Sequence, residues 1–154
     1  ISHTNMYCMS LVLYRKYRPK SFGDLVGRDY LVEIFRNAAK QKKLAHAYIF
    51  YGPRGTGKTS TARLVAKIAN CQMTGVLEKT GESCGRCASC LEIDSGRAMD
   101  VVEIDAASNR GIEEIRELKN SIRLSPAHSR HKVFIIDEAQ MLTKEAFNAF
   151  LKTL

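Results

Sequence analysis

The sequence lacks any apolar run that approaches the roughly 18 residues of a membrane-spanning helix, so we expect no membrane partner. Residues 1–8 have neither a charged start nor an apolar stretch, so we also expect no secretory leader. The 5 cysteines are an odd number, and no secretion signal is expected, which together argue against a disulfide framework. We therefore expect a protein of the reducing cytoplasm.

Acidic residues are scarce in the first half of the chain. Residues 1–70 hold 13 Lys and Arg against 3 Asp and Glu, a net charge of +10, whereas residues 71–154 hold 11 against 13, a net −2. Such a basic excess suits a partner rich in phosphate, a nucleotide or DNA, and it equally suits a solvated surface. The length of 154 residues and the hydrophobic content of 45% are enough for one domain with a core.

The motif that organises the chain is a phosphate-binding loop. Residues 52–59 match the pattern G-x-x-x-x-G-K-[ST] at every fixed position. The apolar run at 47–51 before them predicts a buried strand, and residues 60–70 after them predict a helix. The glycines let backbone amides approach phosphates, Lys58 adds a positive charge, and the Thr59 hydroxyl suits Mg²⁺. The predicted nucleotide-binding residues are Gly52, Pro53, Arg54, Gly55, Thr56, Gly57, Lys58, Thr59 and Ser60.

A second nucleotide-site motif ends the apolar run at residues 132–138, which predicts another strand. A carboxylate at a strand end can hold the coordination shell of Mg²⁺, a role that we assign to Asp137 together with Thr59. Glu138 follows directly and is placed to orient or deprotonate an attacking water. Lys58, Asp137 and Glu138 are therefore the predicted catalytic residues.

The remaining pattern predicts an α/β fold in which helices flank a parallel sheet. A further strand is predicted at residues 100–105, and the loop that follows it lies on the functional side of the sheet. Asp29 is predicted to cap a helix over residues 29–43, and Thr143 to cap a final helix. In the helix over residues 29–43 the expected inward residues are Leu31, Ile34, Phe35 and Ala38.

Four cysteines follow the helix after the phosphate loop, while Cys8 stands apart. They are Cys71, Cys84, Cys87 and Cys90. Their spacing places thiolates on one tight turn, and four sulfurs with no open position are typical of a structural zinc site. Glycines mark residues 71–90 as a polar loop insert without a hydrophobic core, which zinc would replace. An iron–sulfur cluster and four unligated thiols remain the alternatives.

Residues 11–27 indicate an extended arm in which apolar, aromatic and basic side chains are interleaved. Arg18 is biased toward extended geometry by the following Pro19. Two interpretations remain open at this point. The arm either contacts an adenine or a ribose beside the phosphate loop, or packs its apolar side chains on the domain surface.

The chain resembles the gamma/tau subunits of bacterial DNA polymerase III, which are the AAA+ ATPases of the sliding-clamp loader. The resemblance is carried by the four cysteines and by residues 14–19, 46–48, 52–59, 103–108 and 136–142. It covers residues 9–154 as a partial AAA+ nucleotide-binding domain with a zinc insert at 71–90. Residues 1–8 are expected to be an expression remnant or an extension.

The resemblance implies a P-loop NTPase that binds ATP, Mg²⁺ and Zn²⁺. Together with the other clamp-loader subunits, such a subunit uses ATP to load the sliding clamp onto primed DNA during DNA replication. The resemblance also implies that Arg110 faces DNA. It implies an adenine pocket made by Tyr14, Arg18, Pro19 and Val26.

The sequence stops before the sensor strand and the lid of that family. In the family's sheet that strand lies between the strands predicted here at 47–51 and 132–138. We therefore expect an incomplete sheet, and at most weak ATPase activity from this chain alone.

Two other hypotheses are open. One is that the chain holds nucleotide or DNA without turnover, which the effect of Glu138→Gln on phosphate release would decide. The other is a zinc-dependent nucleic-acid binder. It is disfavoured because residues 75–95 carry Lys79 and Arg86 against 4 acidic residues, which leaves no basic surface.

Overall fold

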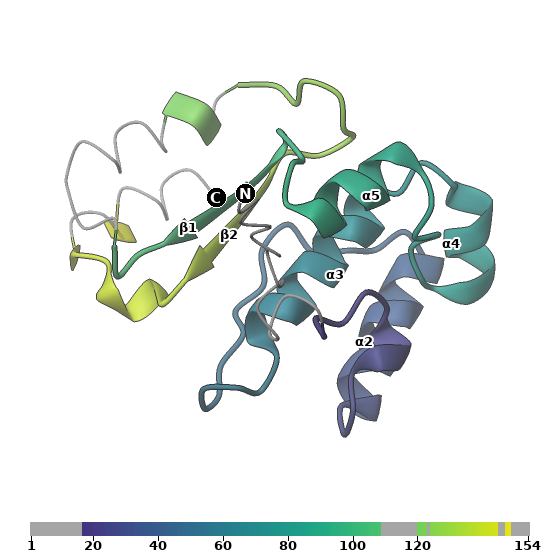
Figure 1. Ribbon diagram of the computed structural model, residues 1–154, viewed down its shortest axis with the longest axis horizontal. Coiled ribbons are helices and arrows are strands. Elements are labelled where there is room, and N and C mark those ends of the chain that lie inside the picture. The colour runs from purple at the N-terminus through teal and green to yellow at the C-terminus, as the bar shows by residue number, and fades with distance from the viewer. Residues whose placement is uncertain (1–16, 109–119, 123, 145–146, 149–154) are drawn as a thin grey trace, which may run out of the picture.

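The computed structural model describes residues 17–108, 120–122, 124–144 and 147–148. Its elements in chain order are η1 (Phe22–Asp24), α2 (Asp29–Lys40), α3 (Lys58–Asn70), α4 (Thr74–Thr80), α5 (Ala88–Ser95), β1 (Val101–Asp105), β2 (Val133–Asp137) and η2 (Ala139–Met141). Figure 1 shows the two strands side by side, with the four helices grouped on one side of them. Within the described ranges no helix combines the length and the apolar character needed to cross a membrane.

The strands β1 and β2 form a parallel pair in direct register, from Val101 beside Val133 to Asp105 beside Asp137. Both are rich in β-branched residues, which fit a pleated and partly buried surface. The predicted α/β fold with a parallel sheet is thus confirmed for these two strands.

The predicted strand at residues 47–51 is wrong, because this run belongs to no β-ladder among the described residues. A strand persists where a neighbouring strand satisfies its backbone groups, and within the described ranges β2 pairs only with β1. Ile49 and Tyr51 are 93% and 100% exposed as a result.

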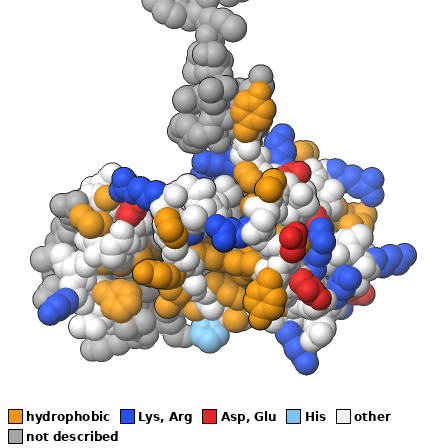
Figure 2. Space-filling model, turned by 90° about the horizontal axis from the view of Figure 1, so that it is seen from below, with side chains coloured by type: hydrophobic (Ala, Val, Ile, Leu, Met, Phe, Trp, Pro, Cys, Tyr) orange, Lys and Arg blue, Asp and Glu red, His pale blue; other side chains and the backbone are white. Residues whose placement is uncertain are grey.

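Figure 2 shows one face of the molecule, where hydrophobic side chains gather near the centre and basic side chains are scattered around them.

The helix α2 differs from its prediction at both ends and on its buried face. Arg28 is the N-cap, so Asp29 is the first helical residue rather than the cap, and the helix ends at Lys40. The buried residues are Val32, Phe35 and Ala39, whereas Ile34 is 47% exposed. The sequence offers two overlapping apolar faces, and packing against the rest of the core selects the one that contains Val32.

The insert after α3 contains α4 and the start of α5, so the prediction of a loop over residues 71–90 is wrong for these helices and holds for 71–73 and 81–87. Gly75 lies inside α4, and Gly81 and Gly96 end α4 and α5 in the left-handed conformation, with φ of 74° and 70°. Figure 1 shows α4 beside α2 and α5 beside α3, which agrees with the contacts between these pairs. The insert therefore packs against the body of the domain.

The hydrophobic core is shared between the insert and the first half of the chain. Its buried members are Phe22, Leu25, Val32, Phe35, Ala39, Leu64, Ile68, Cys71, Leu77 and Cys90. Phe35 is central, with ring centroids of Phe22, Tyr48 and Phe50 at 5.7, 5.2 and 6.0 Å. Leu77 of α4 belongs to this core, so the expectation that the insert lacks apolar packing is also wrong.

Buried polar side chains tie the strand pair to the helices. At the end of α3, Asn70 donates to the carbonyl of His131 at 2.9 Å and accepts from its N–H at 2.8 Å. Just before β1, the Asp100 carboxylate accepts three backbone N–H groups, from residues 127, 128 and 129, at 2.7–2.8 Å. The segment that leads into β2 is thus fixed by Asn70 at the end of α3 and by Asp100 just before β1.

Candidate nucleotide and metal sites

The phosphate loop leads directly into α3, whose N-cap is Gly57. Gly55 and Gly57 have φ of 78° and 83°, values that other residues adopt only with strain. The loop closes on itself because the Thr56 hydroxyl donates to the carbonyl of Pro53 at 2.9 Å. The loop and the amino end of a 13-residue helix therefore meet at one point, an arrangement that favours an anion.

The Lys58 ammonium lies folded over this loop. It donates to the carbonyl of Gly52 at 2.9 Å and to that of Pro53 at 2.8 Å. Both acceptors are weak compared with an anionic oxygen, and phosphate oxygens could replace them at the same place. The Lys58 ammonium, which is predicted to contact a phosphate, therefore already lies against the loop.

Thr59 and Asp137 meet although 78 residues separate them in sequence. The Thr59 hydroxyl, in the first turn of α3, donates to Asp137 Oδ2 at 2.8 Å, at the carboxyl end of β2. A hydroxyl and a carboxylate are hard oxygen ligands of the kind that Mg²⁺ prefers. The two residues predicted to share a magnesium ion thus lie within reach of one ion, and their chemistry fits it.

Glu138 faces the phosphate loop because its backbone turns. Successive side chains of a strand point to opposite faces, so a regular strand would direct Glu138 away from Asp137 and Thr59. Glu138 instead adopts φ 50° and ψ 40°, which ends β2 and begins η2. Its carboxylate then reaches Arg54 of the loop, with 3.6 Å between Oε1 and the guanidinium. The structure thus brings both predicted acidic residues to the same side.

Two acidic residues of β1, the strand beside β2, were not predicted as part of the site from the sequence. Asp105 ends β1 in register with Asp137, and its carboxylate accepts from the N–H of Ala107 at 2.9 Å and from the Ser108 hydroxyl at 2.7 Å. Glu103 pairs with Arg63 of α3. The available signal was the position of Asp105 at the end of a predicted strand, which matches the position of Asp137.

The predicted adenine pocket is only partly described. Arg18 and Pro19 are half-buried, whereas Val26 is 94% exposed. Next to Val26, Leu25 is buried and lies under the loop, with its Cδ2 3.9 Å from the place where a Cβ on Gly57 would be. Tyr14 lies outside the described residues. Arg110, predicted to face DNA, also lies outside them.

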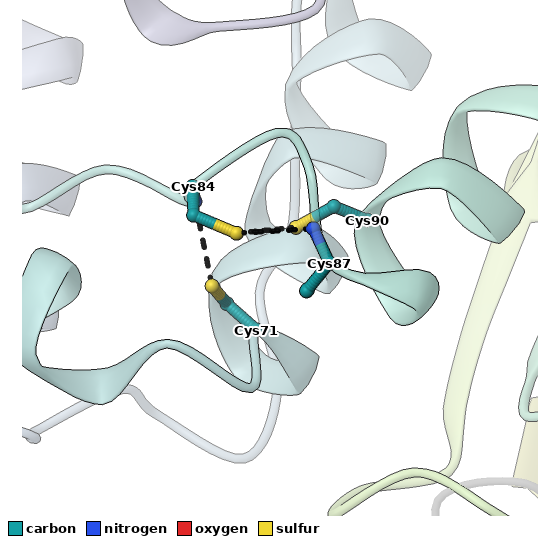
Figure 3. A group of neighbouring side chains, drawn as sticks. All are labelled: Cys71, Cys84, Cys87 and Cys90. Carbon is teal, nitrogen blue, oxygen red and sulfur yellow. Dashed lines mark hydrogen bonds between the residues drawn. The ribbon is translucent and has the colours of Figure 1, made fainter.

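The four cysteines form a cluster at the end of α3 (Figure 3), where Cys71 is the C-cap of the helix and Cys87 is the N-cap of α5. All four sulfurs lie within 4.8 Å of one another, and those of Cys84 and Cys90 are 4.0 Å apart. Tetrahedral zinc with Zn–S bonds of about 2.3 Å requires sulfurs about 3.8 Å apart. The donor set and its spacing therefore fit zinc.

The thiols of this cluster have unlike environments. Burial raises the pKa of Cys71 and of Cys90. Burial opposes ionisation of Cys84 too, but hydrogen bonds from backbone N–H groups of Arg86 and Cys87 outweigh it and lower the pKa of Cys84 to about 6. A bound metal ion would place a positive charge beside the buried sulfurs and so stabilise their thiolate form.

The comparison with known proteins decides the family. A family model described as "DNA polymerase III, delta subunit" matches residues 27–154. The chain belongs to this family of DNA polymerase III subunits. Curated relatives carry the names of other subunits of the same polymerase.

The DNA polymerase III subunit tau of Bacillus subtilis is 49% identical over 142 residues, which are 92% of this chain and 24% of that protein. The subunit tau of Escherichia coli is 47% identical over 143 residues, 93% of this chain and 22% of its own length. The subunit gamma/tau of Mycoplasma pneumoniae is 48% identical over 146 residues, 95% and 21% respectively. The resemblance to gamma/tau subunits is thereby confirmed, and the chain spans about a quarter of the length of these relatives.

Proposed function

We propose that this chain is the ATP-binding motor part of a bacterial clamp-loader subunit. In this proposal residues 9–154 are a partial AAA+ domain with a zinc insert at 71–90. The domain couples binding and hydrolysis of ATP to loading of a sliding clamp on primed DNA, together with the other clamp-loader subunits. The observation that carries the proposal is the contact of Thr59 with Asp137 beside the phosphate loop.

The residues divide the chemistry between them. The loop amides and the amino end of α3 bind phosphate oxygens, and Lys58 contacts the outer phosphates. Thr59 and Asp137 would hold Mg²⁺, which offsets the charge of the triphosphate. Glu138 orients a water and accepts its proton as the water oxygen attacks the γ-phosphorus. The bond from that phosphorus to the bridging oxygen breaks, and ADP and phosphate leave.

The cysteine cluster has a structural role in this proposal. Zinc bound by Cys71, Cys84, Cys87 and Cys90 would close the insert and fix the carboxyl end of α3. No cysteine of the cluster is near the residues that are proposed to act on the triphosphate. The cysteine cluster is at the carboxyl end of α3, and the phosphate loop is at its amino end. The helix between them is about 20 Å long.

Nucleotide binding is the first test. The protein is titrated with a fluorescent ATP analogue and Mg²⁺, and Lys58→Ala is compared with the matched control Lys79→Ala in α4. We expect binding by the wild type and by Lys79→Ala, and binding reduced about 100-fold or more in Lys58→Ala, because a charged hydrogen bond to phosphate is lost. Equal binding by all three proteins would contradict a phosphate-loop site.

Turnover is tested separately, in the assembled complex of the full-length subunit. Phosphate release in the presence of primed DNA and the clamp should fall about 100-fold or more in Glu138→Gln, while nucleotide still binds. Binding without any phosphate release in the wild type would favour the alternative, a nucleotide- or DNA-binding module without turnover.

A further inference from the structure

Both carboxylate oxygens of Glu138 are engaged by side chains that no part of the proposed reaction uses. Oε1 lies 3.6 Å from the guanidinium of Arg54, and Oε2 accepts a hydrogen bond from the side-chain amide of Gln140. A carboxylate that orients water or accepts its proton needs one oxygen free and directed at the phosphates. In this arrangement Oε2 is hydrogen-bonded, and Oε1, the oxygen left for water, lies beside the positive charge of Arg54.

The backbone holds the carboxylate of Glu138 in this place. The N–H of Glu138 donates to Asp137 Oδ1 at 3.0 Å, and its carbonyl accepts from the N–H of Met141 at 2.8 Å. The left-handed conformation at φ 50° is uncommon for a residue other than glycine, and these contacts maintain it. Of the two side-chain partners, Gln140 is on η2 close to Glu138, whereas Arg54 is on the phosphate loop.

Arg54 is the partner that a nucleotide can attract away. It stands inside the loop between Pro53 and Gly55, and its side chain is 92% exposed, so it can rotate without disturbing the core. A phosphate group offers guanidinium the same paired oxygens as a carboxylate and carries more charge. Because Oε1 is the oxygen held by a loop residue, it is also the oxygen that faces the loop.

We propose that Arg54 is a nucleotide-sensitive positioning residue for Glu138. Without nucleotide, Arg54 covers Oε1. With a triphosphate in the loop, Arg54 turns to the phosphates and Oε1 becomes free for water, while Gln140 keeps Oε2 and hence the direction of the carboxylate. The inference rests on the proposed function, because it requires the loop to bind a nucleotide.

The contact between Arg54 and Glu138 has a measurable consequence for binding. If nucleotide must break it, removing the charge of Glu138 by Glu138→Gln strengthens nucleotide binding. Part of that gain comes from lower repulsion between Glu138 and the phosphates, and this part does not depend on Arg54. A double-mutant cycle separates the two contributions.

The experiment measures the Kd of ATP with Mg²⁺, at low salt, for the wild type, Glu138→Gln, Arg54→Gln and the double variant. We expect Glu138→Gln to tighten ATP binding in both backgrounds. The gain should be about two- to fivefold larger when Arg54 is present than in the Arg54→Gln background, which is the coupling expected of an exposed ion pair. The difference should shrink as salt is raised. Arg130→Gln is the control, since Arg130 is an exposed arginine before the other end of β2 and should not couple to Glu138.

Two results overturn the inference, and they differ from each other. Additive effects of Glu138→Gln and Arg54→Gln, in a protein that binds ATP through Lys58, would reject the role of Arg54 and leave the proposed function intact. A wild type that binds no nucleotide would reject both, because nothing would then compete for Arg54. Coupling of the same size with Arg130 would show a general charge effect and would also reject the role.

Discussion

At the scale of single residues, Asp100 shows how a buried charge can support a fold. It is 3% exposed and is surrounded by backbone N–H groups. Hydrogen bonds from Ala127 and His128, with a smaller one from Ser129 and against the effect of burial, lower the pKa of Asp100 to about 2. The carboxylate therefore favours the folded state whenever it is ionised.

The pH dependence of stability follows from the direction of this shift. Because the pKa of Asp100 is about 2 in the fold and 3.8 as the ordinary value, its contribution is present above pH 4 and is lost as the pH falls toward 2. We expect Asp100→Asn to lower the free energy of unfolding by about 2 kcal/mol at pH 7 and by little near pH 2.

Urea denaturation at a series of pH values measures this difference. Asp29→Asn is the control, because Asp29 is an exposed acidic residue in the first turn of α2 and should contribute only a few tenths of a kcal/mol. A constant difference between wild type and Asp100→Asn from pH 7 to pH 2 would contradict the assignment.

Individual residues of the site also show what could and could not be predicted from the sequence. The two motifs predicted a role for Thr59, Asp137 and Glu138, because each motif is short and its spacing is set by the local backbone. It did not predict that Arg54 and Gln140 would hold the Glu138 carboxylate. That contact depends on a turn of the backbone at Glu138, which no periodicity in the sequence signals.

At the scale of elements, α4 illustrates how closely the insert packs on the body of the domain. A Cβ on Gly81 would lie 2.6 Å from the carbonyl oxygen of Arg36 in α2, and Gly81 has φ 74°. Arg36 also pairs with Glu82, and Lys42 with Glu78 at 2.7 Å. The close approach of α2 and α4 therefore requires glycine at position 81.

Gly75 inside α4 and Gly81, the C-cap of this helix, make a matched pair of substitutions. Gly81→Ala should lower the free energy of unfolding by about 2 kcal/mol or more, since it adds a backbone clash to an unfavourable φ. Gly75→Ala should raise it by about 0.5–1 kcal/mol, because Gly75 is inside the helix and has nothing within 4 Å of its would-be Cβ. Thermal or urea unfolding measures both, and equal effects would contradict the packing of α4 on α2.

The elements show which predictions depended on context. The helix α3 and the strands β1 and β2 were predicted to within two residues at each end, because apolar periodicity and the motif spacing agree there. The helices α4 and α5 were not predicted, because Gly75, Gly81, Gly85 and Ser83 indicated a loop in this part of the sequence. Gly81 and Gly96 do end helices, but only the backbone shows that helices precede them.

At the scale of the whole molecule, the cysteine cluster joins the insert to α3 and to the shared core. We expect purified protein to contain about one zinc per chain, and chelation to lower its melting temperature by several degrees, because metal binding contributes to folding free energy. Cys90→Ser should do the same, whereas Cys8→Ser should not, because Cys8 stands apart from the four clustered cysteines in the sequence. Elemental analysis and thermal melting measure these changes.

The same measurements distinguish the competing interpretations of the cluster. Iron and a visible absorption band in place of zinc would identify an iron–sulfur cluster. A melting temperature unaffected by chelation in a metal-free protein would indicate unligated thiols.

The sequence by itself determined the parts of this protein that depend on near neighbours along the chain. These are the phosphate loop with α3, the acidic end of β2 and the spacing of the four cysteines, whose chemistry follows from residue type and short-range geometry. Tertiary structure alone decided that residues 47–51 stay outside the sheet, which face of α2 is buried, and where Glu138 points. These features require partners far along the chain, because strands need a neighbouring ladder and side chains need a surface to pack against.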